Sequence, residues 1–383
     1  MRREALYVSS DRRCRGDGGG IQPLVVHFGT HKTGSTSIQE TLHANISRLD
    51  KVDFMAFGLA NASLTIRNAF MQPERLARRL PPDAARNPNL RRRRARERFK
   101  SALAALKPER RAILSAELIS HLDADECADL VETLRAAGKP LIFVGYMRDP
   151  VSYYRSWFQQ RLKKHGTTLA PEGDAALTLG YNRIINELDA LIGAENVWVY
   201  PFDRAIFPQG DVVRHFLHIQ GIDADEITLH HSNESLPLLA VKALYCYRRH
   251  GDRNEHALGD PASRKPFIAK LAALDSPAFR LHPDLEARIA SANESVLDWS
   301  EHRLGQRLAP PSRREGKDGV RDDSDLMHFT PVEMEQLERW AGPDAPVQRV
   351  ETSDPVHVAA LLAAKRRAML PADRRAALVS GPP

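Results

Sequence analysis

The sequence predicts an α/β protein with three layers, in which a central parallel sheet lies between two layers of helices, and with a C-terminal helical extension. Four apolar runs recur before residue 204, and their apolar residues are nearly continuous instead of alternating with polar ones. Strands of this composition are buried on both faces, as in parallel sheets. Amphipathic stretches lie between the runs and provide the helical crossovers that a parallel sheet needs.

The expected elements follow one another in a regular order. The apolar runs predict strands at 23–29, 111–117, 140–148 and 196–203, and residues 51–58 are a candidate for a further strand. The stretches between them predict helices at 35–48, 90–106, 123–137, 150–164 and 175–192, and beyond residue 232 helices are expected at 236–249, 265–274, 283–300, 331–341 and 357–369. Residues 308–325 are polar and contain Pro and Gly, so a mobile segment is expected there.

These elements also predict the domain organisation. Residues 1–22 are expected to form a flexible leader, residues 23–300 an α/β domain whose C-terminal part is helical, and residues 301–383 a polar linker with a helical tail. The composition, with 42% hydrophobic and 27% charged residues in 383, is that of a soluble globular protein. The leader lacks the apolar run of a secretion signal, and no stretch is long enough to span a membrane. We therefore expect a cytoplasmic protein, and the Arg- and Ala-rich composition suggests a bacterial chain.

Cysteine and charge usage exclude further classes. The three cysteines make neither a disulfide framework nor a metal cluster. The net charge of +6 is concentrated in residues 86–100, RNPNLRRRRARERFK. No known nucleic-acid module accompanies this run, so nucleic acid is not expected as a partner. The favoured interpretation is a solvated arginine-rich helix face, and the alternative is a share in holding an anionic acceptor.

A glycine-containing loop follows the first expected strand, in the segment HFGTHKTGSTSIQ (27–39). Gly29, Gly34 and the start of the following helix would present backbone N–H groups and a positive dipole end to an anion. In nucleoside-triphosphate loops the second Gly is followed by Lys and then by Ser or Thr, which hold the phosphates and magnesium. Here Ser35 takes that position and Lys32 lies inside the loop. This favours a shorter anhydride, with one phosphate joined to one transferable group.

The segment resembles the phosphosulfate-binding loop of the sulfotransferase family, especially its bacterial and carbohydrate-type branch, whose α/β fold is similar to that of P-loop proteins. The resemblance implies that the donor is 3′-phosphoadenosine 5′-phosphosulfate (PAPS) and that no metal ion is needed. It also implies that Lys32 contacts the bridging oxygen between phosphate and sulfate. The implied 5′-phosphate ligands are the backbone groups of Thr33, Gly34, Ser35 and Thr36, the hydroxyls of Ser35 and Thr36, and, as a further candidate, Ser37.

A second anion site is then required for the 3′-phosphate, and the family places it at the end of a later strand. The segment LIFVGYMRDPVSYYRSWFQQ (141–160) is similar to that site. The resemblance implies that Arg148 and Ser156 clamp the 3′-phosphate, as the permanent charge and forked donors of arginine allow. Ser152 lies one helical turn before Ser156 and is a weaker candidate. Alone, Arg148 would be interpreted as a strand-end arginine in a salt bridge.

A third segment, HSNESLPLLAVKAL from His231, is similar to a stretch that precedes a helix in related bacterial sequences. Asn233 or Ser235 could lie near the nucleotide there. The alternative is that Ser235 caps the following helix.

Sulfuryl transfer to a hydroxyl needs a base, and some family branches use His while others use Glu. The segment AILSAELISHLD (112–123) offers Glu117 at the end of a strand and His121 four residues later. Because the carbohydrate-type branch is closer, Glu117 is the favoured base, and its alternative role is an acid at a helix N-terminus. His31 is expected beside the sulfate or acceptor, or only as part of the loop. His27 is expected in the core, and His121 and Asp123 are weaker candidates for acceptor contacts.

The sequence thus predicts a PAPS-dependent sulfotransferase that acts on a hydroxyl-bearing acceptor. A carbohydrate or glycoconjugate, such as an anionic glycan, is implied by the branch resemblance only. Two alternatives remain open, a P-loop phosphotransferase and a catalytically inactive protein that binds 3′-phosphoadenosine 5′-phosphate (PAP). The absent Lys after Gly34 argues against the first. The intact Lys32, Arg148 and Ser156 argue against the second.

Overall fold

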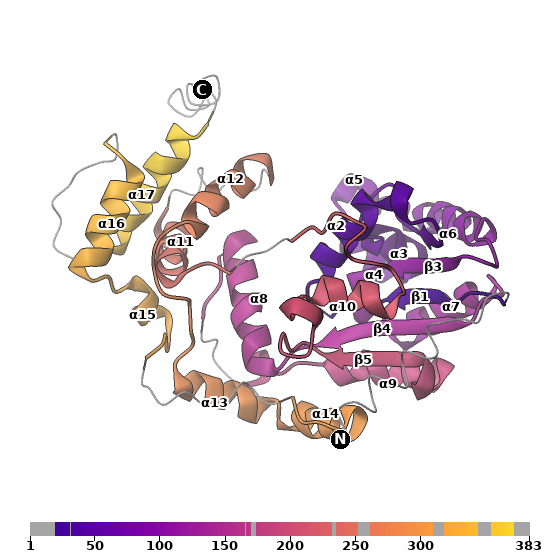
Figure 1. Ribbon diagram of the computed structural model, residues 1–383. Coiled ribbons are helices and arrows are strands. Elements are labelled where there is room, and N and C mark those ends of the chain that lie inside the picture. Colours follow the sequence, from indigo (N-terminus) through magenta and orange to yellow (C-terminus); the bar gives the residue numbers. More distant parts are fainter. Residues whose placement is uncertain are drawn as a thin grey trace. The chain divides into compact units, whose positions relative to one another are not determined.

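The computed structural model describes residues 20–30, 32–164, 166–169, 174–231, 235–251, 261–308, 318–343 and 354–370. Within these, the chain forms two compact units, which are treated one at a time (Figure 1). The α/β unit is made of Met1–Asp149, Leu179–Ser232 and Ser295–Ala309 as far as they are described, and the helical unit of Pro150–Thr178, Asn233–Glu294 and Pro310–Pro383. The domain limits expected after residues 22 and 300 stay predictions. None of the described helices is both long and apolar enough to cross a membrane.

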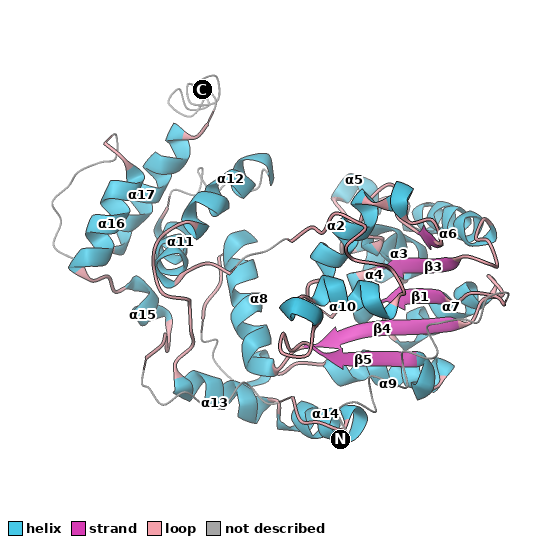
Figure 2. Ribbon diagram, viewed as in Figure 1, coloured by secondary structure: helices cyan, strands magenta, loops and turns pink. Residues whose placement is uncertain are grey.

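The α/β unit is built on one sheet of five parallel strands, drawn as magenta arrows in Figure 2. The strands lie side by side in the order β2-β3-β1-β4-β5. They are β1 (Leu24–His27), β2 (Val52–Phe54), β3 (Arg111–Ser115), β4 (Leu141–Met147) and β5 (Val197–Pro201). The predicted α/β class, the parallel sheet and all five strands are therefore confirmed.

β1 is the central strand, and later strands are added on both sides of it. β3 pairs on one side of β1 and β4 on the other. In such sheets a crevice for ligands opens beyond the carboxyl ends of the strands, at the point where the strand order reverses. His27 at the end of β1 lies opposite Ser115 of β3. The residues two positions later, Gly29 and Glu117, therefore leave the sheet next to each other.

Helices cover both faces of the sheet, as expected for three layers. α2 (Ser35–Ala44) and α10 (Val212–Ile219) pack on one face. There Ile38 and Phe216 share a buried cluster with Val25, Ile113 and Val144 of the central strands. α9 (Tyr181–Ile192) contacts β4 and β5 and packs against α7 (Ala124–Arg135), and both belong to the second layer (Figure 1).

Several short elements of the α/β unit were not expected. α3, α4, α5 and α10 are each at most eight residues long, so they show too few turns for their period to be recognised. The predicted helix at 35–48 ends earlier, and a short 3-10 helix follows it. The remaining described helices of this unit are α3 (Ser63–Phe70), α4 (Pro73–Ala77), α5 (Pro82–Ala85), α6 (Pro88–Ala104) and α14 (Glu294–Leu304). Its described 3-10 helices are η1 (Ile46–Arg48), η2 (Glu117–His121), η4 (Ala194–Asn196) and η5 (Pro208–Gly210), while η3 (Asp174–Leu177) belongs to the helical unit.

The helical unit has its own hydrophobic core, to which the buried helix α11 contributes Leu239, Leu244 and Tyr247 among others. Lys242 of α11 is ion-paired with Glu333 of α16, with 2.7 Å between Nζ and Oε2. The helices are α8 (Pro150–Lys164), α11 (Leu238–His250), α12 (Pro261–Ala272), α13 (Pro283–Ala292), α15 (Asp323–Met327), α16 (Pro331–Ala341) and α17 (Pro355–Ala368). The predicted helical extension is confirmed.

Two expectations for the C-terminal part are corrected. The single helix predicted at 283–300 is two helices, because the buried Asn293 ends α13 and donates its side-chain amide to the carbonyl oxygens of Leu177 and Ile289. The polar segment 308–325, expected to be mobile, contains the start of α15, which Asp322 caps. Residues 309–317 of that segment lie outside the described part, as do residues 1–19 of the expected leader.

Candidate functional site

Three strand ends bring the predicted site residues of the α/β unit together. The loop with Lys32 follows β1, Glu117 follows β3, and Arg148 follows β4. These strands are neighbours in the sheet, so the three segments leave the same edge side by side. His31 lies outside the described residues, so its predicted place beside the sulfate stays a prediction.

The loop after β1 contains two residues with unusual backbone conformations. Lys32 and Gly34 both have left-handed conformations, with φ of 73° and 80°. A side chain larger than glycine rarely adopts this conformation, and it persists where surrounding contacts require it. The side chain of Thr33 is fully buried, and its hydroxyl donates to the carbonyl oxygen of Thr30 at 2.6 Å. The Thr33 side chain therefore holds the loop, which leaves its backbone for the role predicted from the sequence.

The start of α2 offers donors to an anion. Gly34 is the N-cap residue and has no side chain with which to cap the helix. No acidic residue occurs in the first turn, so the positive end of the helix dipole is not neutralised from within the helix. Ser35 is buried, and among the described residues its Oγ has no hydrogen-bond partner. A buried hydroxyl without a partner is costly, and a phosphate oxygen bound there would satisfy it.

The absence of a side chain at Gly29 lets the loop backbone, Ser35 and Glu117 come close together. A Cβ atom added to Gly29 would lie 2.1 Å from Oγ of Ser35 and 3.1 Å from Cγ of Glu117. No side chain fits in that space, so glycine is required where the loop passes between the two. Glu117 is half-buried at the start of the 3-10 helix η2. The predicted base Glu117 and the predicted phosphate ligand Ser35 therefore both lie close to the same glycine.

Arg148 is tied directly to the loop. One of its guanidinium nitrogens, Nη1, donates to the carbonyl oxygen of Lys32 at 3.0 Å. The guanidinium carbon also lies 4.9 Å from the ring centre of Phe202, a stacked position that orients the plane of the group. Phe202 was not singled out from the sequence, where only its position at the end of an apolar strand distinguishes it. The two sequence motifs, separated by more than a hundred residues, thus meet at one edge of the sheet.

A network of buried hydrogen bonds links the end of β1, which precedes the loop, to β3 and α2. His27 is fully buried, and its Nδ1 lies 2.8 Å from Oγ of Ser115. The same Oγ accepts from the side-chain amide of Gln39 on α2, at 3.1 Å. The prediction of a hydrogen-bonded core histidine is confirmed. Burial lowers the pKa of His27 to about 4, although the nearby Glu117 carboxylate acts in the opposite direction.

Because two histidines are buried, we expect the free energy of unfolding of this protein to fall in mild acid. Burial and, to a smaller extent, His218 lower the pKa of His215 to about 4, so this imidazole, like that of His27, is neutral in the folded protein. The unfolded chain takes up these protons near pH 6.5, and the folded protein only near pH 4. The free energy of unfolding should therefore be highest above pH 6.5. It should fall between pH 6.5 and 4, by about 3 kcal/mol for each of the two histidines.

Urea unfolding at several pH values between 7 and 4.5 measures this loss. His215→Gln should give a shallower fall than the wild type. His43→Gln, which alters an exposed histidine of α2, serves as the matched control and should keep the wild-type slope. Equal slopes for all three proteins would show that the buried histidines do not cause the acid sensitivity.

The other predicted residues belong to the helical unit, have structural contacts or lie outside the described residues. Ser156 and Ser152 lie one turn apart on α8, which belongs to the helical unit, and their role at a nucleotide stays a prediction. Asp123 caps α7 in a reciprocal capping box and forms an ion pair with Arg75, so its carboxylate serves the fold. Ser235 does not cap α11, whose N-cap residue is Pro237, and Asn233 lies outside the described residues.

Comparisons with known proteins are sparse. No family model matches the chain, and no curated protein matches it. Among solved structures, the chain is similar to the crystal structure of a sulfotransferase from Alicyclobacillus acidocaldarius, with a TM-score of 0.34 and 14% sequence identity. The likeness covers 64% of this chain and 99% of that one.

Proposed function

We propose that this chain is a PAPS-dependent sulfotransferase, which moves the sulfuryl group of PAPS to a hydroxyl of an acceptor. The observation that carries the proposal is the contact between the two anion-binding motifs, through the bond from Arg148 to the carbonyl oxygen of Lys32. PAPS carries a phosphate on each side of its ribose, and two motifs that each contribute one cationic side chain at one sheet edge support the binding of such a nucleotide.

In this proposal the loop holds the 5′ end of the donor. The backbone groups from Thr33 to Thr36 and the hydroxyls of Ser35 and Thr36 bind the 5′-phosphate, with Ser37 as a further ligand. The unpartnered hydroxyl of Ser35 and the uncapped start of α2 support this role. Lys32 neutralises the oxygen that bridges phosphorus and sulfur. Arg148 and Ser156 bind the 3′-phosphate.

The reaction is an in-line displacement at sulfur. The acceptor oxygen forms a new bond to sulfur while the bond from sulfur to the bridging oxygen breaks, and the products are a sulfate ester and PAP. Glu117 takes the proton of the acceptor hydroxyl, and Lys32 stabilises the negative charge that develops on the leaving oxygen. The closeness of Glu117 to the loop at Gly29 supports this division of roles.

Nucleotide preference separates the proposal from its rivals. PAP without metal should raise the midpoint of thermal unfolding more than ATP with magnesium does. A stronger shift with ATP and magnesium would instead favour a P-loop phosphotransferase. Transfer from ³⁵S-labelled PAPS to cell-extract carbohydrates then tests for turnover. PAP binding without any labelled product would indicate a protein that binds the nucleotide but does not catalyse.

Arg148→Ala should weaken PAP binding by about 10- to 100-fold, because a charge-assisted bond to the 3′-phosphate is lost. Adenosine 5′-phosphate, which lacks that phosphate, should lose little affinity, and isothermal titration calorimetry measures both. Arg204→Ala removes an exposed arginine of the same unit and is the matched control. An equal loss for both nucleotides would mean that Arg148 acts only through its bond to the Lys32 carbonyl.

A further inference from the structure

The arginines of α6 have two different environments. Arg92 and Arg96 face α7 and are ion-paired with Asp129, and Arg92 Nη2 lies 3.0 Å from its Oδ2. Both side chains are about three-quarters buried, with 24% exposed. The expected interpretation of a solvated helix face is therefore wrong for these two residues, which join α6 to the second helix layer.

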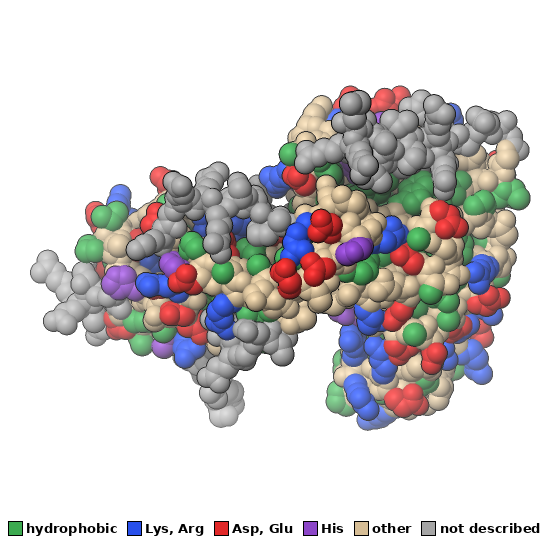
Figure 3. Space-filling model, turned by 90° about the horizontal axis from the view of Figure 1, so that it is seen from below, with side chains coloured by type: hydrophobic (Ala, Val, Ile, Leu, Met, Phe, Trp, Pro, Cys, Tyr) green, Lys and Arg blue, Asp and Glu red, His purple; other side chains and the backbone are tan. Residues whose placement is uncertain are grey.

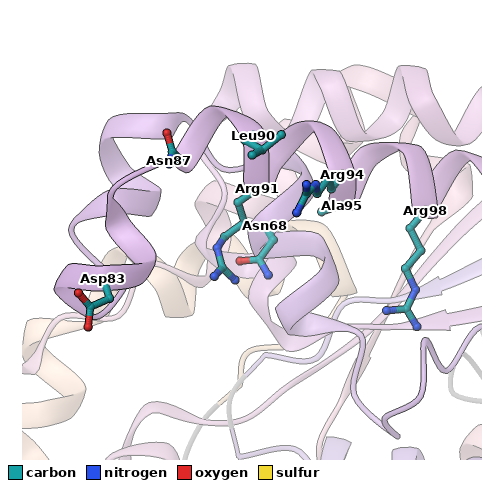
Figure 4. Close-up of a pocket in the computed structure, with 8 residues that line it drawn as sticks. All are labelled: Asn68, Asp83, Asn87, Leu90, Arg91, Arg94, Ala95 and Arg98. Carbon is teal, nitrogen blue, oxygen red and sulfur yellow. The ribbon is translucent and has the colours of Figure 1, made fainter.

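The opposite side of α6 lines an open groove of about 470 Å³ (Figure 4). Arg91, Arg94 and Arg98 lie along it, three and four residues apart, so they share one side of the helix. Asn68 of α3 and Asn87, the residue before α6, also line the groove. All of these belong to the α/β unit, on which Lys and Arg side chains gather at the lower right of Figure 3.

The positive charge of this groove is poorly balanced. Asp83 is the acidic residue among its lining residues, and it forms an exposed ion pair with Arg86 at 3.0 Å. Burial lowers the pKa of the neighbouring Arg67, and repulsion from Arg91 and Arg79 lowers it further. The arginines around the groove therefore repel one another, and an anion bound there would relieve that repulsion.

The lining residues favour one class of anion. Among the residues that line the groove none is aromatic, so bases of a nucleic acid would have no ring on which to stack. The two asparagines can donate to and accept from sugar hydroxyls. From Arg91 to Arg98 the helix rises by roughly 10 Å, which spaces the guanidinium groups along an extended chain. We propose that this groove binds an anionic polysaccharide that carries carboxylate or sulfate groups at intervals.

α3 connects the groove to the candidate base. Ser63, at the start of α3, accepts a hydrogen bond from the backbone N–H of Leu118 at 3.1 Å, next to Glu117. Asn68, five residues later, lines the groove and lies about 7.5 Å further along the helix axis. A bound chain could therefore reach from the groove to Glu117. This inference rests on the proposed function in naming its acceptor class, while binding to the groove needs no PAPS.

The test is direct binding, without nucleotide, of a fluorescein-labelled galacturonate hexasaccharide and a heparin-derived hexasaccharide. The full chain should bind at least one of them, and the double variant Arg91→Ser/Arg94→Ser should weaken binding at least about tenfold. The matched control Arg93→Ser/Lys100→Ser removes two charges from the other side of α6, which lines a separate pocket. It should change the affinity less than about threefold.

Three outcomes would overturn this inference. One is a wild-type chain that binds neither hexasaccharide at 0.15 M salt. Another is an equal loss in the two double variants, which would indicate unspecific attraction by the whole helix. The last is tighter binding of hexathymidylate, which would identify a nucleic-acid surface. The PAP-induced thermal shift should be the same in both double variants as in the wild type, so a missing shift in all proteins would refute the proposed function and leave this test intact.

Discussion

Lys32→Ala should lower the rate of sulfuryl transfer by about 100- to 1,000-fold, while the affinity for PAP falls far less. The leaving oxygen gains negative charge only as the bond to sulfur breaks, so the cation beside it stabilises the transition state more than the bound donor. The backbone of the loop, which is fixed by the Thr33 hydroxyl and by Arg148, should keep its cradle in the variant. The nucleotide should therefore still bind.

Single-turnover transfer from labelled PAPS and calorimetry with PAP measure the two effects separately. Lys51→Ala, which removes an exposed lysine of the same unit, is the matched control for charge. Alanine in a left-handed conformation costs about as much as lysine does, so the loop should not become more strained. If rate and PAP affinity fell by the same factor, Lys32 would be a binding residue and the proposed transition-state role would be wrong.

The sheet could be predicted from the sequence because each strand is marked by a run of apolar residues within its own segment. The three central strands β1, β3 and β4 are buried almost throughout, and all five strands appear at the expected places. The loop after β1 could also be recognised, since its glycines and its serine and threonine residues lie within one short segment of the sequence. Arg148 was identified through the resemblance of residues 141–160 to the family's 3′-phosphate site, which follows a strand and precedes a helix.

Contacts between distant segments could not be predicted in the same way. Asn293 ends a helix that its local period would continue, because the carbonyl oxygen of Leu177 accepts its side-chain amide. Arg92 and Arg96 appear solvated in a run of arginines, yet their partner Asp129 lies on another helix. The helix that follows Arg148 was predicted correctly, but the core on which it packs was not readable from its own residues.

The candidate site shows the same division. Gly29 was predicted as a loop glycine, whereas its additional role, to leave room for Ser35 and Glu117, depends on the register of β1 against β3. Phe202 orients Arg148 but carries no chemical signal of its own in the sequence. Residues with a charged or hydroxyl side chain can be recognised in the sequence as candidates for catalysis or binding. Residues that only position them are recognised from their contacts in the structure.

Glu117→Gln should abolish measurable transfer, with a loss of about 100- to 10,000-fold, and leave PAP binding near normal. Glutamine has almost the same shape as glutamate, so the packing beside Gly29 and Ser35 should persist. It cannot accept the acceptor proton, and the bond from sulfur to the new oxygen would then form on an oxygen that stays protonated. The loss should be in kcat, and the rise of the rate with pH that reports ionisation of the base should disappear.

His121→Gln is the matched control for the choice of base, because His121 ends the 3-10 helix that Glu117 begins. That variant should keep most of the wild-type rate, and His31→Gln tests the loop histidine in the same assay. A large loss in either histidine variant, together with normal transfer by Glu117→Gln, would move the base to that histidine. Glu117 would then be a structural acid at the start of a helical turn, where a carboxylate is favoured by the local N–H groups.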